Sequence, residues 1–214
     1  MKTIFRIFTL FLIISCASGR QFVSAQEVHF MDTVKSFNRS RLVIDTKGMQ
    51  VLAGSGIVSM VSGGIGVFTA KQEEWKYFHE MNIAWGAVNT TIAVFGFSGI
   101  KKQAKEKLVP QKAYASFQSD KKVYLINIGL DALYVAAGAG LVQYAKSNTA
   151  HQAMLSGFGK SIVVQGVFLL CFDNVMYASH LRYNHRWLRL IDEMKFTGTG
   201  FTFNYMFPTH HINY

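Results

Sequence analysis

Four long apolar runs alternate with short charged segments, and they dominate the pattern of hydrophobic and polar positions. Residues 48–70 and 82–100 contain no charged residue, and residues 123–145 and 161–180 contain one each. A helix of about 20 apolar residues crosses the ~30 Å hydrocarbon core of a bilayer. A soluble bundle would instead carry a polar face on each helix, and none of the four runs has one. The pattern therefore predicts an all-α fold, a polytopic membrane bundle of four transmembrane helices.

The remaining segments complete the predicted domain organisation. A basic start, a short apolar run and several small residues form the three-part pattern typical of a signal peptide, here over residues 1–25. We expect an amphipathic lead-in segment at residues 26–47, the transmembrane domain at 48–180 and a basic, aromatic tail at 181–214. Aromatic residues alternate over residues 196–207, which predicts a strand without a partner inside the chain.

The sidedness of the bundle has two conflicting predictions. A cleaved signal peptide would place the mature N-terminus outside the cell. With four spans, the N-terminal segment, residues 101–122 and the tail share one side, and that side holds most of the basic residues. The positive-inside rule assigns such a side to the cytoplasm. Both alternatives stay open, as does lipidation of Cys16, although an ordinary cysteine lost with the signal peptide is favoured.

Composition and charge narrow the classes of partner. Half of the chain is hydrophobic and 16% is charged, which excludes intrinsic disorder, and two cysteines are too few for a disulfide-stapled fold. The net charge is +10. The lysine-rich segment 101–122 flanks membrane spans, so we expect contact with membrane lipids, through anionic headgroups, and no nucleic acid. Small residues at Ala132, Ala136 and Gly140 predict close helix packing, and hence a homo-oligomer or a membrane-protein partner.

Two aspartates inside the apolar runs are the sharpest candidates for function. A carboxyl group in a bilayer costs about 2.5–3.5 kcal/mol on insertion scales, so it faces the bundle interior and has a partner. By helical rise, Asp131 lies about 12 Å and Asp173 about 10.5 Å from the same membrane face. Two such carboxyl groups would share a proton or hold a cation. The predicted intramembrane polar site also includes Asn89, Asn127, Asn174 and Tyr177. The alternative is a structural network that fixes the helix register.

A second candidate cluster lies near the start of the second apolar run. His79, Asn82 and Trp85 are three residues apart, so one helical face can carry them. We expect an interfacial cluster, either an aromatic belt with a polar seam or a ligand-binding vestibule. The sequence contains no zinc-binding spacing, no nucleophile motif and no phosphate-binding loop. We therefore expect no metal, no cofactor and no enzymatic activity.

The chain contains five short motifs: Asn38-x-x-Arg41-Leu42, Lys47-Gly48-Met49, Lys76-Tyr77-Phe78-His79-x-Met81-Asn82-x-x-Trp85-x-x-Val88-Asn89, Asn127-x-Gly129-Leu130-Asp131, and Gln165-Gly166-x-Phe168-Leu169-Leu170-x-Phe172-Asp173-x-x-Met176-Tyr177-x-x-His180. Together they resemble an uncharacterised bacterial family of integral membrane proteins, over roughly residues 35 to 190. The resemblance implies a signal peptide and four helices, and we expect a multi-pass protein of the bacterial inner membrane. It implies no activity.

The sequence leaves two classes of function in view. The first is a structural or accessory membrane bundle that acts through partners or self-association. The alternative is a small proton- or cation-coupled transporter or channel component that uses the intramembrane aspartates. A membrane-embedded hydrolase or lipid enzyme ranks third, because no nucleophile, base and orienting residue converge in the sequence.

Overall fold

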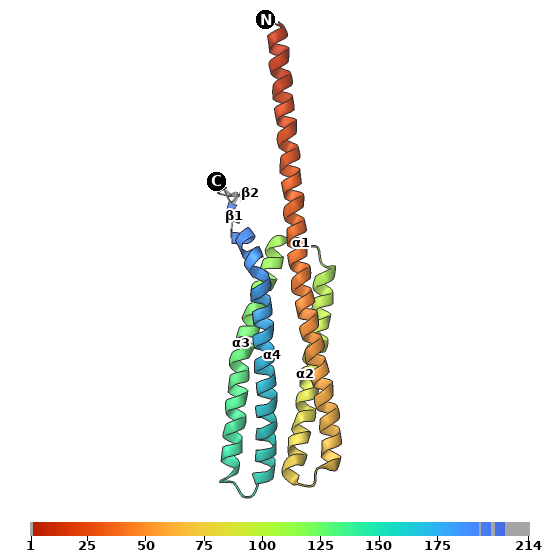
Figure 1. The fold of residues 1–214 in the computed structure, drawn as a ribbon, viewed down its shortest axis with the longest axis vertical. Helices are drawn as coiled ribbons and strands as arrows, with labels where there is room; N and C mark the ends of the chain where they lie inside the picture. The colour runs from red at the N-terminus through yellow and green to blue at the C-terminus, as the bar shows by residue number, and fades with distance from the viewer. Residues whose placement is uncertain (1, 193, 198–199, 204–214) are drawn as a thin grey trace, which may run out of the picture.

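The computed structural model describes the backbone of residues 2–192, 194–197 and 200–203, and the side chains of residue 28 and of residues 30–182. Four helices make up the body of the molecule: α1 (Lys2–Thr69), α2 (Glu73–Lys105), α3 (Pro110–Ala145) and α4 (Gln152–Asp192) (Figure 1). Each contains a segment that is long and apolar enough to cross a membrane. The predicted all-α bundle with four such helices is confirmed, as expected of a multi-pass membrane protein.

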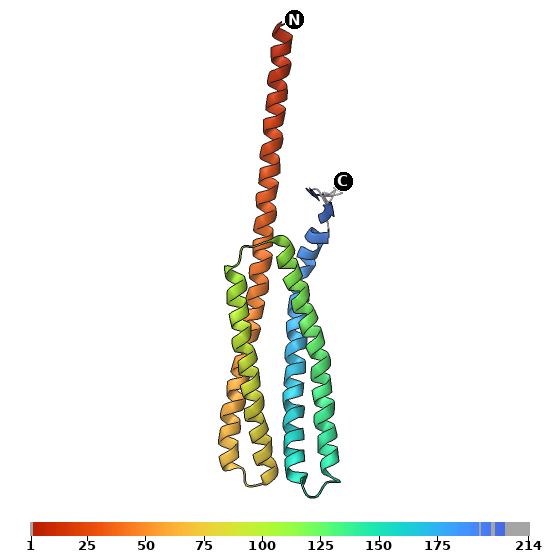
Figure 2. The same cartoon turned by 180° about the vertical axis from the view of Figure 1, so that it is seen from behind.

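The four helices form two antiparallel hairpins that stand side by side. The α1–α2 and α3–α4 turns lie at one end of the bundle, and the α2–α3 connection lies at the other end (Figures 1 and 2). We call these the turn end and the open end. Beyond the open end α1 continues well past the bundle. It therefore joins the predicted signal peptide, the lead-in segment and the first span in one helical backbone, although the side chains of residues 1–27 lie outside the described part.

Local sequence signals explain where the inner helices begin and end. Pro110 occupies the start of α3, a position where its missing N–H would have had no helical partner. Glu73 and Glu74 lie in the first turn of α2, and Lys102 and Lys105 lie in its last turn. Acidic residues near a helix N-terminus and basic residues near its C-terminus both stabilise the helix dipole.

Glycines allow the close helix contacts on which both hairpins depend. In the first hairpin, a Cβ added at Gly86 would lie 2.5 Å from the carbonyl oxygen of Gly56. In the second, a Cβ at Gly138 would lie 2.8 Å from the carbonyl oxygen of Gly159. The two hairpins meet through α2 and α4, where a Cβ at Gly157 would clash with the backbone of α2. Such backbone proximity is typical of helices packed in lipid, where dispersion rather than the hydrophobic effect holds them together.

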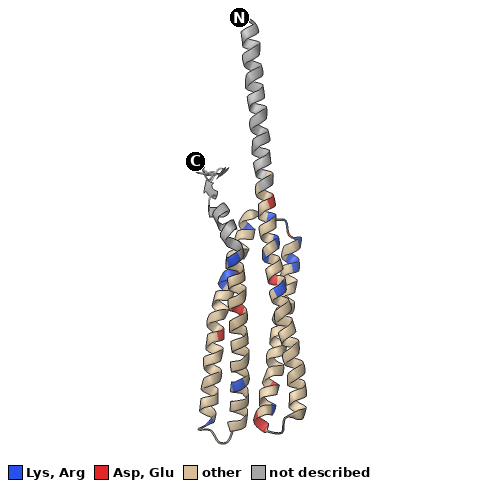
Figure 3. Cartoon of the chain, in the orientation of Figure 1, with Lys and Arg blue, Asp and Glu red and all other residues tan. Residues whose placement is uncertain are grey.

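The distribution of side chains is the reverse of that in a soluble bundle. Large apolar residues face outward, including Phe68 (91% exposed), Phe95 (72%) and Leu133 (65%). Among the described residues, polar or charged side chains are as numerous as apolar ones in the buried interior. Figure 3 shows most charges near the two ends, with long uncharged stretches between them. Hydrocarbon offers no hydrogen bonds, so polar groups gather inside the bundle and leave the apolar face to lipid.

An apolar core lies at the open end, where α1 crosses α3. It contains Val34 and Phe37 from α1 with Ala113 and Phe117 from α3. The rings of Phe37 and Phe117 meet edge to face, with their centroids 5.6 Å apart. This contact fixes α1 against the second hairpin, immediately beyond the polar groups described below.

The tail contains two short strands after α4. Strand β1 (Met194–Thr197) pairs antiparallel with β2 (Gly200–Phe203), so that Phe196 faces Phe201 in the register. The expectation of a strand without a partner in the chain is therefore wrong for the described residues. The alternation over residues 196–207 predicts one strand, whereas residues 194–197 and 200–203 form two strands that pair with each other. The rest of that segment, from residue 204, lies outside the described part of the chain.

Candidate functional site

The two intramembrane aspartates face each other between α3 and α4. Asp131 is 3% exposed and Asp173 is 4% exposed, and their carboxyl groups interact directly. The Asn127 side chain, one turn before Asp131, also interacts with Asp173. The antiparallel hairpin brings them together because residues equally far from the turn lie at the same height. Two carboxyl groups and an amide thus form one polar site inside an apolar segment of the bundle.

This pair lines a cavity of about 300 Å³ between the two hairpins. Three oxygen atoms in the cavity lining have no hydrogen-bond partner among the described residues: Asp131 Oδ2, Asp173 Oδ1 and Asn89 Oδ1. The described lining residues include no lysine, arginine or histidine. The cavity therefore presents hydrogen-bond acceptors and the carboxyl groups of Asp131 and Asp173, which have no cationic side chain beside them in the described lining.

Towards the open end, Arg41 connects three helices through a buried network. Its Nη1 lies 2.6 Å from Asp120 Oδ2 on α3 and 3.7 Å from Asp45 Oδ2, one turn further along α1. Its Nη2 donates hydrogen bonds to Gln103 Oε1 on α2 at 2.6 Å and to Asn38 Oδ1 at 3.1 Å. The planar guanidinium suits this geometry, because its several N–H groups point towards different acceptors at once.

His180 completes this network from α4. Its Nδ1 lies 2.9 Å from the Met176 carbonyl oxygen, and its Nε2 lies 3.1 Å from Asp45 Oδ1. Tyr124 donates a hydrogen bond to the same Asp45 oxygen at 3.4 Å. A carbonyl oxygen and a carboxylate oxygen are both acceptors, so the position suits an imidazole ring that carries hydrogen on both nitrogens. With a charged His180, the two cations and two carboxylates of the network balance.

The network includes one group of residues with the spacing of a metal site. Ligand atoms of Asp45, Asp120 and His180 all lie within 4.8 Å of one another. The guanidinium of Arg41 already contacts both carboxylates, and a cation so close opposes a metal ion. The geometry therefore fits an ion-pair network better than a metal centre. We assign it a structural role, with the Arg41 guanidinium as its permanent positive charge.

A second network ties three helices together on the turn-end side of the aspartates. Gln165 Nε2 donates hydrogen bonds to Asn82 Oδ1 at 2.9 Å and to Ser59 Oγ at 3.1 Å. Ser161 Oγ donates to the same Asn82 oxygen at 3.2 Å. Asn89 Nδ2 lies 3.5 Å from Gln165 Oε1. Because Asn89 also lines the aspartate cavity, its amide joins this network to the carboxyl pair.

The turn end of the bundle has an ion pair of its own. Lys160 Nζ lies 2.5 Å from Glu74 Oε1, and Ser156 donates a hydrogen bond to the same oxygen at 2.5 Å. The Lys160 ammonium also lies over the ring of Trp75, 5.2 Å from its centroid. These contacts hold α2 against α4 where the helices approach the membrane surface.

Polar side chains of α4 consequently run along the bundle axis from one end to the other. Lys160, Gln165, Asp173 and His180 each belong to one of the groups described above. Twenty residues of helix separate the first from the last, which corresponds to about 30 Å, the thickness of a hydrocarbon core. We call these four residues the α4 polar row.

The other residues predicted for the intramembrane site do not all join it. Asn89 lines the cavity of the two aspartates. Asn174 is exposed, and its Nδ2 donates a hydrogen bond to the Leu170 carbonyl oxygen of its own helix at 2.7 Å. Tyr177 is half-buried and does not line the cavity. A helix turns by about 100° per residue, so a neighbour of Asp173 in sequence points to a different side.

The three residues of the predicted interfacial cluster point to three different neighbours. His79 packs on α1, where its ring fills the space beside Gly66. Asn82 belongs to the buried amide network. Trp85 lines the aspartate cavity, and its ring meets that of Tyr134 edge to face with centroids 5.3 Å apart. A step of three residues drifts around the helix, so these side chains do not form one vestibule.

The Arg41 network was not predicted as a site, although its sequence offered one signal. Arg41 and Asp45 are four residues apart, the spacing of neighbours on one helical face. Asp120 and Tyr124 show the same spacing on α3. The charged members of both pairs lie just outside the apolar runs, where charged residues are ordinarily solvated. Only the crossing of α1 over α3 and α4 buries them together with His180.

Comparison with known proteins gives one match. The model of a family described as a family of unknown function, DUF6992, matches residues 51–174. These residues extend from the first span to the residue after Asp173. They include both intramembrane aspartates and the amide network. The comparison with curated proteins and the comparison with solved structures gave no match.

Proposed function

This chain belongs to the DUF6992 family, a family of unknown function, and we propose that it binds a proton or a small cation between its two hairpins. The binding site is the carboxyl pair of Asp131 and Asp173. The observation that carries the proposal is a pair of buried, mutually interacting carboxyl groups in a cavity whose described lining has no cationic side chain. The proposed function is binding and translocation rather than an enzymatic reaction.

The electrostatics of the pair support this proposal. Two carboxylates about 4 Å apart repel each other by roughly 4 kcal/mol at an effective dielectric constant of about 20. Burial inside a bilayer opposes ionisation further. The pair therefore either holds one shared proton or is neutralised by a cation. Asn127 and Asn89 supply amide groups that orient or coordinate the bound species.

Polar groups on both sides of the pair support a role in translocation. On the turn-end side, Asn89 connects the cavity to Gln165 and so to the amide network. On the open-end side, Asp120 and Tyr124 line the same cavity and also belong to the Arg41 network. A proton or cation at the carboxyl pair would thus have polar side chains ahead of it and behind it. We propose a small proton- or cation-coupled transporter or channel component.

Infrared spectroscopy on the full chain in membranes tests binding directly. A shared proton predicts an absorption band of a protonated carboxyl group, which the double variant with Asp131→Asn and Asp173→Asn removes. Bound sodium or potassium instead predicts that the unfolding midpoint rises with the concentration of that ion, and that the double variant loses this rise. Asp32→Asn is the matched control, because it removes an exposed carboxylate of α1. Absence of both signals would refute the proposed site.

Flux in vesicles then separates binding from transport. The full chain is reconstituted into liposomes that contain a pH indicator, and proton uptake is followed under an imposed gradient with and without sodium or potassium. We expect uptake that Asp131→Asn and Asp173→Asn abolish and that Asp32→Asn preserves. Binding without flux would leave the carboxyl pair as a sensor or a structural element and would exclude the transport step.

Self-association is a second candidate function, and one observation favours it. Gly129, Ala132, Ala136 and Gly140 are all exposed on α3, at steps of three and four residues. A Cβ added at Gly129 or Gly140 would meet no atom within 4 Å. Small residues at such spacing let a second helix approach closely in lipid. We propose this face of α3 as the contact of an accessory bundle with a second copy or another membrane protein.

Energy transfer between labelled chains in a bilayer tests the α3 face. We expect association that Ala136→Leu weakens at least tenfold, because the larger side chain separates the helices. Gly54→Leu is the control, since Gly54 is exposed on α1 and also has no atom near its added Cβ. Equal association of the two variants, or a wild-type chain that stays monomeric at every dilution, would refute this role.

The proposal also covers the lipid contacts, the signal peptide and the membrane in which the protein lies. We propose that the basic residues of 101–122 contact anionic headgroups at the open end, that residues 1–25 act as a signal peptide, and that the protein lies in a bacterial inner membrane. The support is the sequence pattern and its resemblance. An epitope or cysteine placed at Ser116 and labelled from one side of intact cells would give the sidedness.

A further inference from the structure

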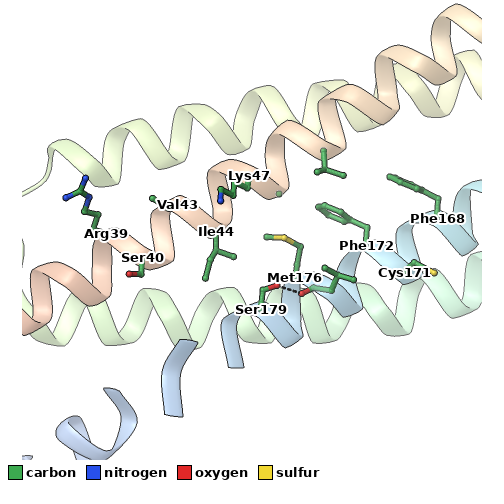
Figure 4. A pocket seen from close by; sticks show the side chains of 13 residues that line it. Arg39, Ser40, Val43, Ile44, Lys47, Phe168, Cys171, Phe172, Met176 and Ser179 are labelled. Carbon is green, nitrogen blue, oxygen red and sulfur yellow. Dashed lines mark hydrogen bonds between the residues drawn. The ribbon is translucent and has the colours of Figure 1, made fainter. Parts of the chain in front are cut away.

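A second and larger cavity lies between α1 and α4. Its volume is about 600 Å³, and its wall is mostly apolar (Figure 4). Phe172 lines both this cavity and the aspartate cavity, so the two are neighbours on different sides of α4. The Met176 side chain covers Gly48 and forms part of the wall. The described residues that line this cavity include no aspartate and no glutamate.

The open-end half of the cavity is basic. Arg39 and Lys47 both line it, both are exposed, and neither has an ion-pair partner among the described residues. They lie on α1 eight residues apart, which corresponds to about 12 Å of helical rise. Lys47 directly precedes the charge-free segment that begins at Gly48. Two uncompensated cations therefore stand at the level where a membrane helix leaves the headgroups and enters hydrocarbon.

The other half of the cavity is apolar and open to lipid. Val51 is 55% exposed and Val175 is 64% exposed, and Phe168 lies at the far end of the wall from Arg39 (Figure 4). Val51 lies four residues past Lys47 on α1, which corresponds to about 6 Å of helical rise into the hydrocarbon. The cavity thus has its cationic end at the interface and its apolar end in the hydrocarbon.

We propose that this cavity binds one anionic phospholipid from the surrounding bilayer. The phosphate lies between Arg39 and Lys47, and an acyl chain runs along Val51 towards Phe168. Charge complementarity selects an anionic headgroup, because its net negative charge offsets the two cations in part, whereas a zwitterionic lipid has no net charge. A basic residue near an anionic membrane surface contributes about fivefold in affinity. The site is separate from the carboxyl pair, so neither proposal depends on the other.

Photo-crosslinking from the cavity wall tests the proposal. Cys171 is exposed and lines the cavity, so a benzophenone maleimide attached there, in the full chain with Cys16→Ser, samples its contents. The labelled chain is placed in vesicles of equal parts phosphatidylglycerol and phosphatidylcholine, and the adducts are identified by mass spectrometry. We expect phosphatidylglycerol adducts to exceed phosphatidylcholine adducts at least about fivefold.

Two charge-matched double variants give the test its specificity. Arg39→Gln with Lys47→Gln should return the adducts to equal proportions. Lys101→Gln with Lys122→Gln removes the same charge from exposed positions on α2 and α3, and should leave the enrichment unchanged. Equal adducts in the wild-type chain, loss of enrichment in the Lys101 and Lys122 variant instead, or crosslinks only to a second chain or to a free fatty acid would each overturn the proposal.

A measurement on the unlabelled chain protects the test against disturbance by the benzophenone. Native mass spectrometry of the chain released from the same vesicles should retain one phosphatidylglycerol molecule. The Arg39 and Lys47 variant should retain it at least about fivefold less often. Retention of both lipids in equal amounts would overturn the proposal independently of the crosslinking result.

Discussion

The contact between α3 and α4 depends on two facing glycines, and a single added methyl group should disrupt it. A Cβ at Gly138 would lie 2.8 Å from the Gly159 carbonyl oxygen and 2.9 Å from the Val163 backbone nitrogen. Ordinary contacts of a Cβ begin at 3.4 Å. Backbone atoms cannot swing aside as a flexible side chain can, so Gly138→Ala must push the two helices apart by about half an ångström.

The magnitude follows from what this separation removes. A gap of about 0.5–1 Å forfeits roughly a quarter to a half of the dispersion energy of the atoms that line it. Overpacking of a close contact typically costs about 1–3 kcal/mol, and we expect Gly138→Ala to lower the free energy of unfolding by that amount. Gly140, two residues along the same helix, has no atom within 4 Å of its added Cβ. Gly140→Ala should therefore stay within about 0.5 kcal/mol of the wild type.

Unfolding of the full chain in mixed lipid and detergent micelles measures both variants. The denaturing detergent is titrated, and circular dichroism and tryptophan fluorescence give the midpoint. Gly159→Ala should cost as much as Gly138→Ala, and the double variant should cost less than the sum, because the first methyl group has already separated the helices. A Gly138→Ala variant as stable as Gly140→Ala would refute the assignment of this contact as a backbone-to-backbone approach.

Three further predictions concern polar groups. Arg41→Met leaves two carboxylates of the network without their guanidinium and should lower the free energy of unfolding by about 3–5 kcal/mol. Lys35→Met removes an exposed ion pair of the same helix and should lower it by less than about 1 kcal/mol. Equal losses in the unfolding assay would contradict the buried network. Gln165→Leu removes three interhelical hydrogen bonds and should lower stability by about 1–2 kcal/mol in the same assay, and an unchanged midpoint would contradict the amide network. The hydrogen bond from Lys112 holds the pKa of Glu106 below its usual range. This contact therefore stabilises the α2–α3 connection at neutral pH and is lost as the pH falls through that lowered pKa. Lys112→Met should raise the pKa of Glu106 in a carbon-13 NMR titration, and an unchanged pKa would exclude the contact.

The number and approximate position of the spanning helices could be predicted from the sequence. Charge-free runs of about 20 residues have few alternatives to a membrane helix, because isolated charges in hydrocarbon are costly. The ends of the helices were less predictable. The structure begins α2 at Glu73, well before the apolar run at Asn82, and continues α4 to Asp192. Polar residues at a membrane surface are as compatible with a helix as with a loop, so hydropathy alone does not mark these ends.

The candidate site could be predicted in part for a geometric reason. Asp131 and Asp173 lie on adjacent antiparallel helices, so counting residues from the turn places them at one height. The same count places Asn174 there, but height says nothing of direction around the helix, and its side chain points outward. Asn89 was placed at a similar level, and it does line the cavity. Depth is a property of the sequence, whereas rotation depends on which neighbour each helix packs against.

The sequence by itself determined that this protein has four helices long and apolar enough to cross a membrane, that carboxyl groups lie within them and that glycines are available for close packing. Only the tertiary structure decided which polar groups meet. Arg41 pairs with Asp120 across 79 residues, and Gln165 reaches Ser59 across 106. The physical reason is that hydrocarbon offers polar side chains no solvent, so the partners they have lie inside the bundle, and the sequence is compatible with several sets of partners. The rotation and crossing of the helices, set by the glycine contacts, select one of them.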